Sequence, residues 1–170
     1  PNYTPKFNRY QEGFMDRDKS IGMFIGLAIG DALGAPLEFQ EAREPDNFLT
    51  KYTSGGAHNV SIGEWTDDTS MALAIAKSLI EKKTFDADDI MQKFCNWYEK
   101  GDYSTRGKCF DIGGTVSVAL RSYSKTINTS EYLQPYRGRI ATDTSGNGAL
   151  MRMAPVIMVA KNPFHAMQLA

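Results

Sequence analysis

The sequence has 170 residues, of which 42% are hydrophobic and 23% are charged, and its formal net charge at pH 7 is −1. This length is sufficient for one globular domain with a substantial hydrophobic core, and the composition is ordinary for such a domain. The near-neutral charge and the absence of a Lys/Arg cluster exclude the basic surface that a nucleic-acid partner requires.

The sequence predicts a cytoplasmic protein without a membrane partner. Its N-terminus is polar and has no apolar signal-peptide region. The longest apolar stretch, Ile21 to Ile29, contains glycine and is too short to cross a bilayer. Cys95 and Cys109 lack the spacing of a metal-binding pair or of a disulfide framework, which favours a reduced environment.

Residues 1–15 are predicted to form an irregular N-terminal arm, and residues 16–170 to form part of a single helical domain. From Asp16 the apolar residues repeat with helical spacing, which predicts a first helix that ends at Gly34-Ala35-Pro36. Glycine recurs every fourth residue in this helix, although each glycine costs up to about 1 kcal/mol relative to alanine. Such a stripe indicates close approach by another backbone or by a ligand. At Gly22 and Gly26 we expect tight packing against another helix.

The remaining predicted elements are helices as well. A long loop over residues 40–64 precedes two helices, one from about Asp67 to Lys82 and one between an Asp86 cap and a Gly101 stop. A fourth helix is expected from Gly113 to Ser122, and a fifth begins near Asn147 after a turn-rich segment over residues 124–144. Asn162-Pro163 is typical of a further helix start. Because no strand-type alternation is present, the sequence predicts a compact, multi-helix, all-α fold.

The segment Glu64-Trp65-Thr66-Asp67-Asp68-Thr69-Ser70 carries the strongest chemical signal. It places the side-chain oxygens of Thr66, Asp67 and Asp68 at a helix N-terminus, where a magnesium or manganese ion could bind them. Successive residues of a regular helix point about 100° apart, so these three must straddle the helix start to share one ion. The alternative is that the same residues cap the helix and interact with its dipole without any metal.

Four blocks of sequence occur in a set order along the chain: Gly30 to Glu38, Trp65 to Thr69, Phe110 to Thr115, and Ser145 to Arg152. Together they resemble the ADP-ribosylglycohydrolase family, which includes the dinitrogenase-reductase-activating glycohydrolases. The resemblance covers nearly the whole chain from Asp16 onward. It implies an all-helical enzyme that hydrolyses the bond joining ADP-ribose to a modified protein side chain or to a small-molecule acceptor.

The resemblance also implies roles for individual residues. Thr66, Asp67 and Asp68 would be ligands of a site for two magnesium or manganese ions. Glu38 would lie near the reacting ribose, and Asp111 would act as a base or position a water. The residues expected to line the ADP-ribose cleft are Gly113, Gly114, Ser145, Gly146, Asn147 and Gly148.

The chemistry of these residue types agrees with those roles. Cleavage at the anomeric carbon passes through an oxocarbenium-like state, which a carboxylate stabilises, and a second carboxylate can activate water. Glycine-rich turns that lead into helices present backbone N–H groups to a diphosphate.

Alternatives remain for each residue. Glu38 could be a solvated loop acid, Asp111 a helix N-cap, and Asn147-Gly148 a simple turn. Asp31 is expected to form a cap or to hydrogen-bond a loop.

The sequence departs from the family pattern in one respect. Family members carry a second acidic motif, of the Asp-x-Asp-Thr kind, which completes the metal pair, and nothing after Asp68 supplies it here. The chain is therefore expected to be truncated at its C-terminus and to need the missing half as a partner for activity. The alternative is a non-catalytic ADP-ribose-binding or structural relative. The acceptor and the choice between magnesium and manganese stay open.

Overall fold

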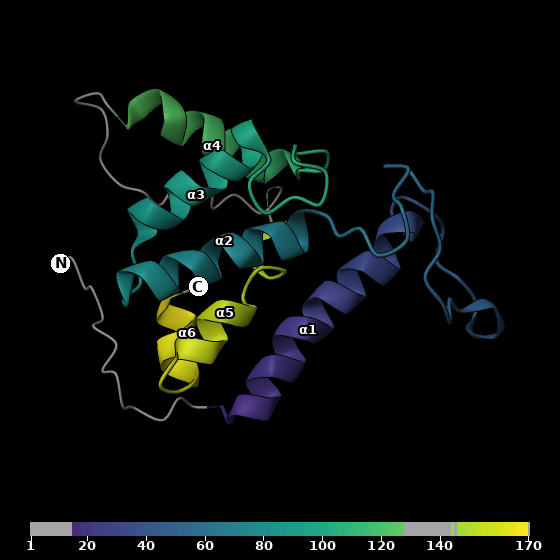
Figure 1. The fold of residues 1–170 in the computed structure, drawn as a ribbon, viewed down its shortest axis with the longest axis horizontal. Coiled ribbons are helices and arrows are strands. Elements are labelled where there is room, and N and C mark those ends of the chain that lie inside the picture. The colour runs from purple at the N-terminus through teal and green to yellow at the C-terminus, as the bar shows by residue number, and fades with distance from the viewer. Residues whose placement is uncertain (1–14, 128–143, 145, 170) are drawn as a thin grey trace.

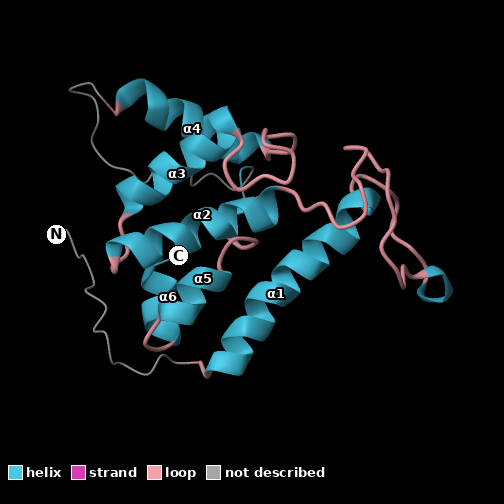
Figure 2. Cartoon of the chain, in the orientation of Figure 1, coloured by secondary structure: helices cyan, strands magenta, loops and turns pink. Residues whose placement is uncertain are grey.

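A computed structural model of the chain describes residues 15–127, 144 and 146–169 (Figure 1). The predicted N-terminal arm lies outside this part, except for Met15. Within it the chain forms helices joined by loops (Figure 2). A single isolated β-bridge joins Gly55 and Val60 in this part of the chain. The α-helices are α1 (Arg17–Gly34), α2 (Asp67–Lys82), α3 (Ala87–Lys100), α4 (Gly114–Thr126), α5 (Ala154–Val159) and α6 (Pro163–Leu169). The fold of the described residues is all-α, as the sequence predicts.

Local signals set the ends of the early helices. Asp16 caps α1 by accepting a hydrogen bond from the Lys19 amide at 2.9 Å, and Asp86 caps α3 in the same way through the Asp89 amide at 3.0 Å. Gly101 ends α3 with φ +79°, and a side chain there would collide with the backbone at Gly107. The predicted bounds of these helices and of α2 are confirmed to within a residue.

The later helices differ from the prediction. Helix α4 continues four residues past Ser122, to Thr126. The predicted fifth helix is divided into a 3-10 turn, η4 (Asn147–Ala149), and the short α5. Residues 150–152 form a turn between η4 and α5. Met153 is the N-cap of α5, and Pro155 lies in the first turn of that helix, where proline is tolerated.

Helix α2 is at the centre of the packing. It contacts α1, α3 and α5, while α4 packs on the far side of α3 and α6 packs on α5 (Figure 1). Its inward residues Met71, Ile75 and Leu79 are buried as predicted. The rest of the core comes mainly from α3 and α4, with Phe94, Cys95, Trp97, Leu120 and Tyr123.

One face of α1 is open among the described residues. Ile21, Ile25 and Ile29 are 42%, 52% and 50% exposed. A Cβ built at Gly22 or Gly26 would meet no atom within 4 Å. The expected tight packing at these two glycines is therefore wrong for this part of the chain, because no described element lies against that face.

The expectation that no segment is long enough to cross a bilayer is also corrected. Residues Arg17–Leu37, which comprise α1 and the following 3-10 turn η1 (Ala35–Leu37), are long and apolar enough to do so by length and composition. The glycines that interrupt the apolar run do not break the helix. A single helix of this kind near an N-terminus is weak evidence for a membrane span, and α1 here packs on α2 and α5.

Candidate functional site

The site is built where the C-terminal end of α1 meets the N-terminus of α2. The carboxylate of Asp31, on α1, accepts hydrogen bonds from the backbone N–H groups of Thr66 and Thr69 at 3.0–3.1 Å. It also accepts from both threonine hydroxyls, at 2.8 Å and 2.6 Å. Asp31 therefore caps α2 from another helix, in agreement with its predicted hydrogen-bonding role. The Thr66 hydroxyl donates its proton to Asp31, so its lone pairs are left for another partner.

Thr66, Asp67 and Asp68 straddle the start of α2, the arrangement that a shared ion requires. Thr66 holds the N-cap position and the two aspartates are the first residues of the helix. Burial raises the pKa of Asp67, and the charges of Asp111 and Asp31 raise it further. The pKa of Asp68 is raised to about 7 by burial and by the charges of Asp31 and Asp67. The crowding of these carboxylates costs free energy that a bound cation would relieve.

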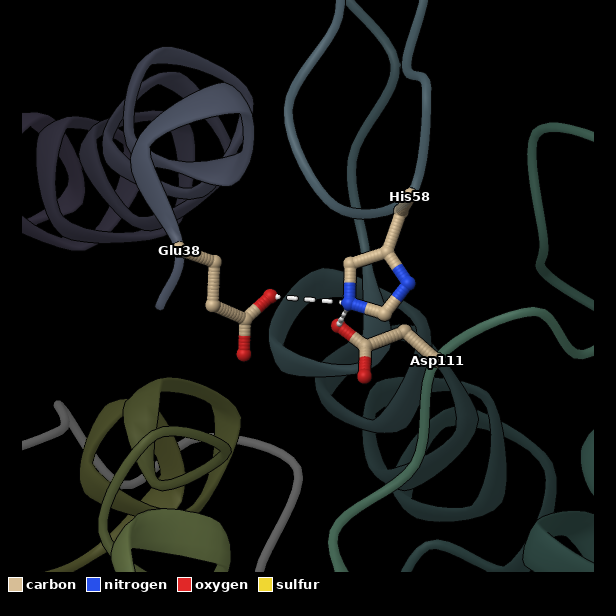
Figure 3. A group of neighbouring side chains, drawn as sticks. All are labelled: Glu38, His58 and Asp111. Carbon is tan, nitrogen blue, oxygen red and sulfur yellow. Dashed lines mark ion pairs between the residues drawn. The ribbon is translucent and has the colours of Figure 1, made fainter. Parts of the chain in front are cut away.

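A second cluster of side chains joins Glu38, His58 and Asp111 (Figure 3). The His58 Nε2 atom lies 3.2 Å from Glu38 Oε2 and 3.5 Å from Asp111 Oδ2. Glu38 follows η1, His58 lies in the loop closed by the bridge, and Asp111 precedes α4. Three segments far apart in the sequence thus bring one imidazole between two carboxylates.

The Asp111 carboxyl has the more unusual environment of the two acids. Burial and the Glu38 charge raise the pKa of Asp111 to about 6, while the His58 charge acts in the opposite direction. A ligand atom from each of Glu38, His58 and Asp111 lies within 4.8 Å of the others, so this group could also hold a metal ion. A carboxyl that titrates near neutral pH can take and return a proton during a reaction.

Asp111 connects the two clusters. Its charge acts on Asp67 at the start of α2, and its own pKa responds to Glu38 and to Asp31. Asp111, one of the predicted catalytic acids, therefore interacts electrostatically with Asp67, one of the predicted metal ligands. The alternative in which Asp111 caps α4 is wrong, because Gly113 occupies that N-cap position. Glu38 is paired with His58 instead of standing free in solvent, although its side chain is 37% exposed.

The glycine-rich segments also meet. Gly113 and Gly114 begin α4 without a side-chain cap, and a Cβ at either would meet no atom within 4 Å. A Cβ at Gly148 would lie 2.7 Å from Val116 of α4, so η4 packs directly on the first turns of that helix. Backbone donors therefore lie beside open space, which suits an anion.

Some predictions about the glycine-rich cleft stay untested. The exposed Asn147 and Gly146 flank the start of η4, while Ser145 lies outside the described residues. The simple-turn interpretation of Asn147-Gly148 remains compatible with this geometry. No ligand contact tests the predicted cleft residues.

His58 is the functional candidate that the sequence did not reveal. It belongs to no motif block and lies in a loop without periodicity. Its single sequence signal is the Gly55-Gly56 pair, which indicates a tight turn just before it. Only the fold brings it to the two acids.

Comparisons with known proteins give a consistent result. The sequence model of the ADP-ribosylglycohydrolase family matches residues 15–170. An ADP-ribosylarginine hydrolase Tri1 of Serratia proteamaculans (strain 568) is 40% identical over 138 residues, which cover 81% of this chain and 36% of that protein. An ADP-ribosyl-[dinitrogen reductase] glycohydrolase of Rhodospirillum rubrum is 35% identical over 144 residues, covering 83% of this chain and 44% of that protein.

A solved structure is similar over a comparable region. It is described as an ADP-ribosylglycohydrolase-related protein complex, and it matches with a TM-score of 0.68 at 34% sequence identity. The match covers 89% of this chain and 46% of that one. The chain thus spans less than half the length of each of these relatives.

Proposed function

Because this chain belongs to the ADP-ribosylglycohydrolase family, we propose that it forms the acidic part of an active site that hydrolyses the glycosidic bond between ADP-ribose and an acceptor. The observation that carries the proposal is the convergence of Glu38 and Asp111 on His58, with the Asp111 charge acting on Asp67 at the start of α2. The proposed substrate is an ADP-ribosylated protein or an ADP-ribosylated small molecule. We propose that the protein acts in the cytoplasm. An arginine acceptor is favoured, because two of the similar proteins are named ADP-ribosylarginine hydrolases.

The two acids have different roles in this proposal. Glu38 lies at the reacting ribose, where its negative charge stabilises the oxocarbenium-like transition state. Asp111 takes a proton from the attacking water as the new C–O bond forms at the anomeric carbon. The bond to the acceptor breaks, and the acceptor leaves with the proton that Asp111 removed from the water, which returns Asp111 to its ionised form. A pKa of about 6 keeps Asp111 ionised at neutral pH and still basic enough to accept that proton.

The residues at the start of α2 fit a divalent cation. Thr66, Asp67 and Asp68 would hold magnesium or manganese, since they offer hard oxygens and since burial and neighbouring carboxylates raise the pKa values of both aspartates. When bound, the ion would orient ribose hydroxyls and water. Two such ions need further ligands, and we propose that these come from a C-terminal half that is absent from this sequence.

The second candidate function is a non-catalytic ADP-ribose-binding or structural protein. It is favoured by one observation, the open space beside Gly113 and Gly114 at the start of α4, which is available to a ligand whether or not a metal binds. In that case the backbone donors at Gly113, Gly114 and η4 would still bind the diphosphate, because main-chain N–H groups do not depend on a metal.

The proposal is tested with the complete protein, ADP-ribosylarginine and Mn²⁺, by following the release of free ADP-ribose. We expect Glu38→Gln and Asp111→Asn each to lower kcat by about 100-fold or more, the usual contribution of a positioned acid or base. Glu41→Gln is the matched control, since Glu41 is exposed on the same segment. Binding of ADP-ribose without hydrolysis of arginine, serine or nucleobase conjugates would favour the non-catalytic alternative.

A further inference from the structure

We propose that His58 is a positioning residue that holds the Glu38 and Asp111 carboxylates in the arrangement that the reaction needs. The inference rests on the proposed function, since it concerns the same two acids. His58 does not contact the reacting atoms in this proposal. It acts through the acids on either side of its Nε2 atom (Figure 3).

The contacts of His58 Nε2 are shared between the acids. The atom lies at ion-pair distance from both, 3.2 Å from Glu38 Oε2 and 3.5 Å from Asp111 Oδ2, yet neither contact has hydrogen-bond geometry. The His58 side chain is only 19% exposed. Two carboxylates so close together repel each other in a partly buried site, and an imidazole that carries a hydrogen on Nε2 reduces that repulsion because this hydrogen faces both of them.

The loop that carries His58 is fixed against the segment that carries Glu38. Gly55 and Val60 exchange two backbone hydrogen bonds of 2.8 Å, which close the loop. Gly56 has φ +72°, and a Cβ on it would lie 2.4 Å from the carbonyl oxygen of Pro36. The loop therefore packs directly on η1 at Pro36, which is two residues before Glu38. Only glycine allows this approach.

Arg106 fixes the same loop to the segment that carries Asp111. Its guanidinium donates to the carbonyl oxygens of His58 and Asn59, both at 3.0 Å, and to the Glu64 carboxylate at 2.7 Å. The guanidinium also stacks over the Phe110 ring at 4.0 Å from the centroid. Since Phe110 precedes Asp111, one arginine sets the position of His58 relative to the second acid.

Two phenylalanine rings lie beside the imidazole ring of His58. The His58 ring lies 6.0 Å from the Phe39 ring and 6.1 Å from the Phe110 ring. Phe39 is 81% exposed and has φ +61°, a conformation that is strained for a bulky residue. Strain of this kind persists where the surroundings require it, often at functional sites. Here it places an aromatic ring against His58 immediately after Glu38.

The test compares His58→Gln, which keeps an N–H donor, with His58→Leu, which keeps bulk without a donor. In the complete protein acting on ADP-ribosylarginine, we expect His58→Leu to lower kcat by about 100-fold, because small displacements of catalytic groups have such effects. His58→Gln should recover much of that loss. KM should change far less than kcat in both variants. Asn59→Gly is the control, since it alters an exposed neighbour in the same loop and tolerates its positive φ of 47°.

Crystal structures provide a readout that does not depend on activity. The Glu38 and Asp111 carboxylates should move apart in His58→Leu and stay together in His58→Gln. Equal losses of kcat in the two variants, an unchanged kcat in His58→Leu, or unmoved carboxylates would overturn the proposal. Loss of a tightly bound Mn²⁺ from His58→Leu, measured by calorimetry, would make His58 a metal ligand and would overturn it too. If the unaltered protein hydrolyses no conjugate, the proposed function fails, and the two crystal structures still decide the positioning role.

Discussion

The pair formed by Arg106 and Glu64 illustrates how a single residue secures the loops around the site. Besides its bonds to the loop carbonyls, Arg106 donates to Glu64 through both Nε and Nη2. The Ser61 amide adds a bond of 2.7 Å to the same carboxylate. These hydrogen bonds lower the pKa of Glu64 below its ordinary value of 4.5, and the bond from Arg106 has a larger effect than the bond from Ser61. In the sequence Glu64 is the first residue of the acidic segment Glu64 to Ser70. In the structure its carboxylate binds the Arg106 guanidinium.

A pH-dependent stability follows from that lowered pKa. The ionised form is favoured in the folded state, so the stabilisation is present above pH 4.5 and is lost as the pH falls through the lower folded value. We expect Glu64→Gln to lower the free energy of unfolding at pH 7 by about 1–2 kcal/mol, the usual worth of a hydrogen bond to a charged group. The difference from the unaltered protein should shrink below pH 4. Urea denaturation at pH 7 and pH 3.5 measures both values, and a difference that is equal at the two pH values would contradict the assignment.

At the scale of elements, the joint between α1 and α2 is made by one side chain. Asp31 satisfies four donors at the start of α2, two of them backbone N–H groups of the buried residues Thr66 and Thr69. The alignment of α2 on α1, and hence the distance from Thr66 to the end of α1, depends on this carboxylate. No local feature of α2 replaces it, because Thr66 makes no side-chain cap of its own.

Asp31→Ala should therefore be strongly destabilising. Two buried N–H groups would lose their partner, at a cost of roughly 1–3 kcal/mol each, and relief of repulsion within the acidic cluster would offset part of this. We expect a net loss of about 3 kcal/mol in the free energy of unfolding. Asp46→Ala, at an exposed position in the 3-10 turn η2 (Pro45–Asn47), is the control and should change stability by less than about 0.5 kcal/mol. Urea denaturation measures the free energy of unfolding of both variants. A loss below about 1 kcal/mol for Asp31→Ala would show that water replaces the carboxylate.

The elements that could be predicted from sequence are those whose ends depend on nearby residues. Asp86 and Gly101 bound α3 through contacts within a few positions, so their spacing was sufficient. The division of the fifth helix and the open face at Gly22 and Gly26 depend on which other segments pack against them. Sequence periodicity does not contain that information. The same holds for His58, whose partners lie 20 and 53 positions away in the printed numbering. Motif blocks located Glu38 and Asp111, but only the fold shows what lies between them.

At the scale of the whole molecule, the site gathers segments from nearly the full described length. Asp31 comes from the end of α1, Glu38 from the residue after η1, His58 from the long loop, Asp111 from the approach to α4, and Gly148 from η4. The hydrophobic core is made mainly by α2, α3 and α4, with Val156 of α5 and Leu169 of α6. The residues that form the core thus differ from those that form the site. The helices provide the buried apolar side chains, while helix ends and connecting loops carry the polar groups of the site. On the proposed function, an anion that binds at the start of α4 would therefore lie on the same side of the molecule as the carboxylates that act on its attached sugar.

The last prediction tests this arrangement with ADP-ribose itself. Gly114→Leu introduces a side chain into the open space at the start of α4, where it would block approach to the backbone donors. We expect at least about a 10-fold rise in the Kd for ADP-ribose, without loss of stability, since leucine favours a helix more than glycine does. Gly26→Leu is the matched control, because Gly26 also lies in a helix beside open space but far along α1 from the site. Calorimetric titration of both variants distinguishes the cases. Binding like that of the unaltered protein in both would mean that the glycine at the start of α4 does not contact the diphosphate, and that the acids of this site serve a ligand held elsewhere.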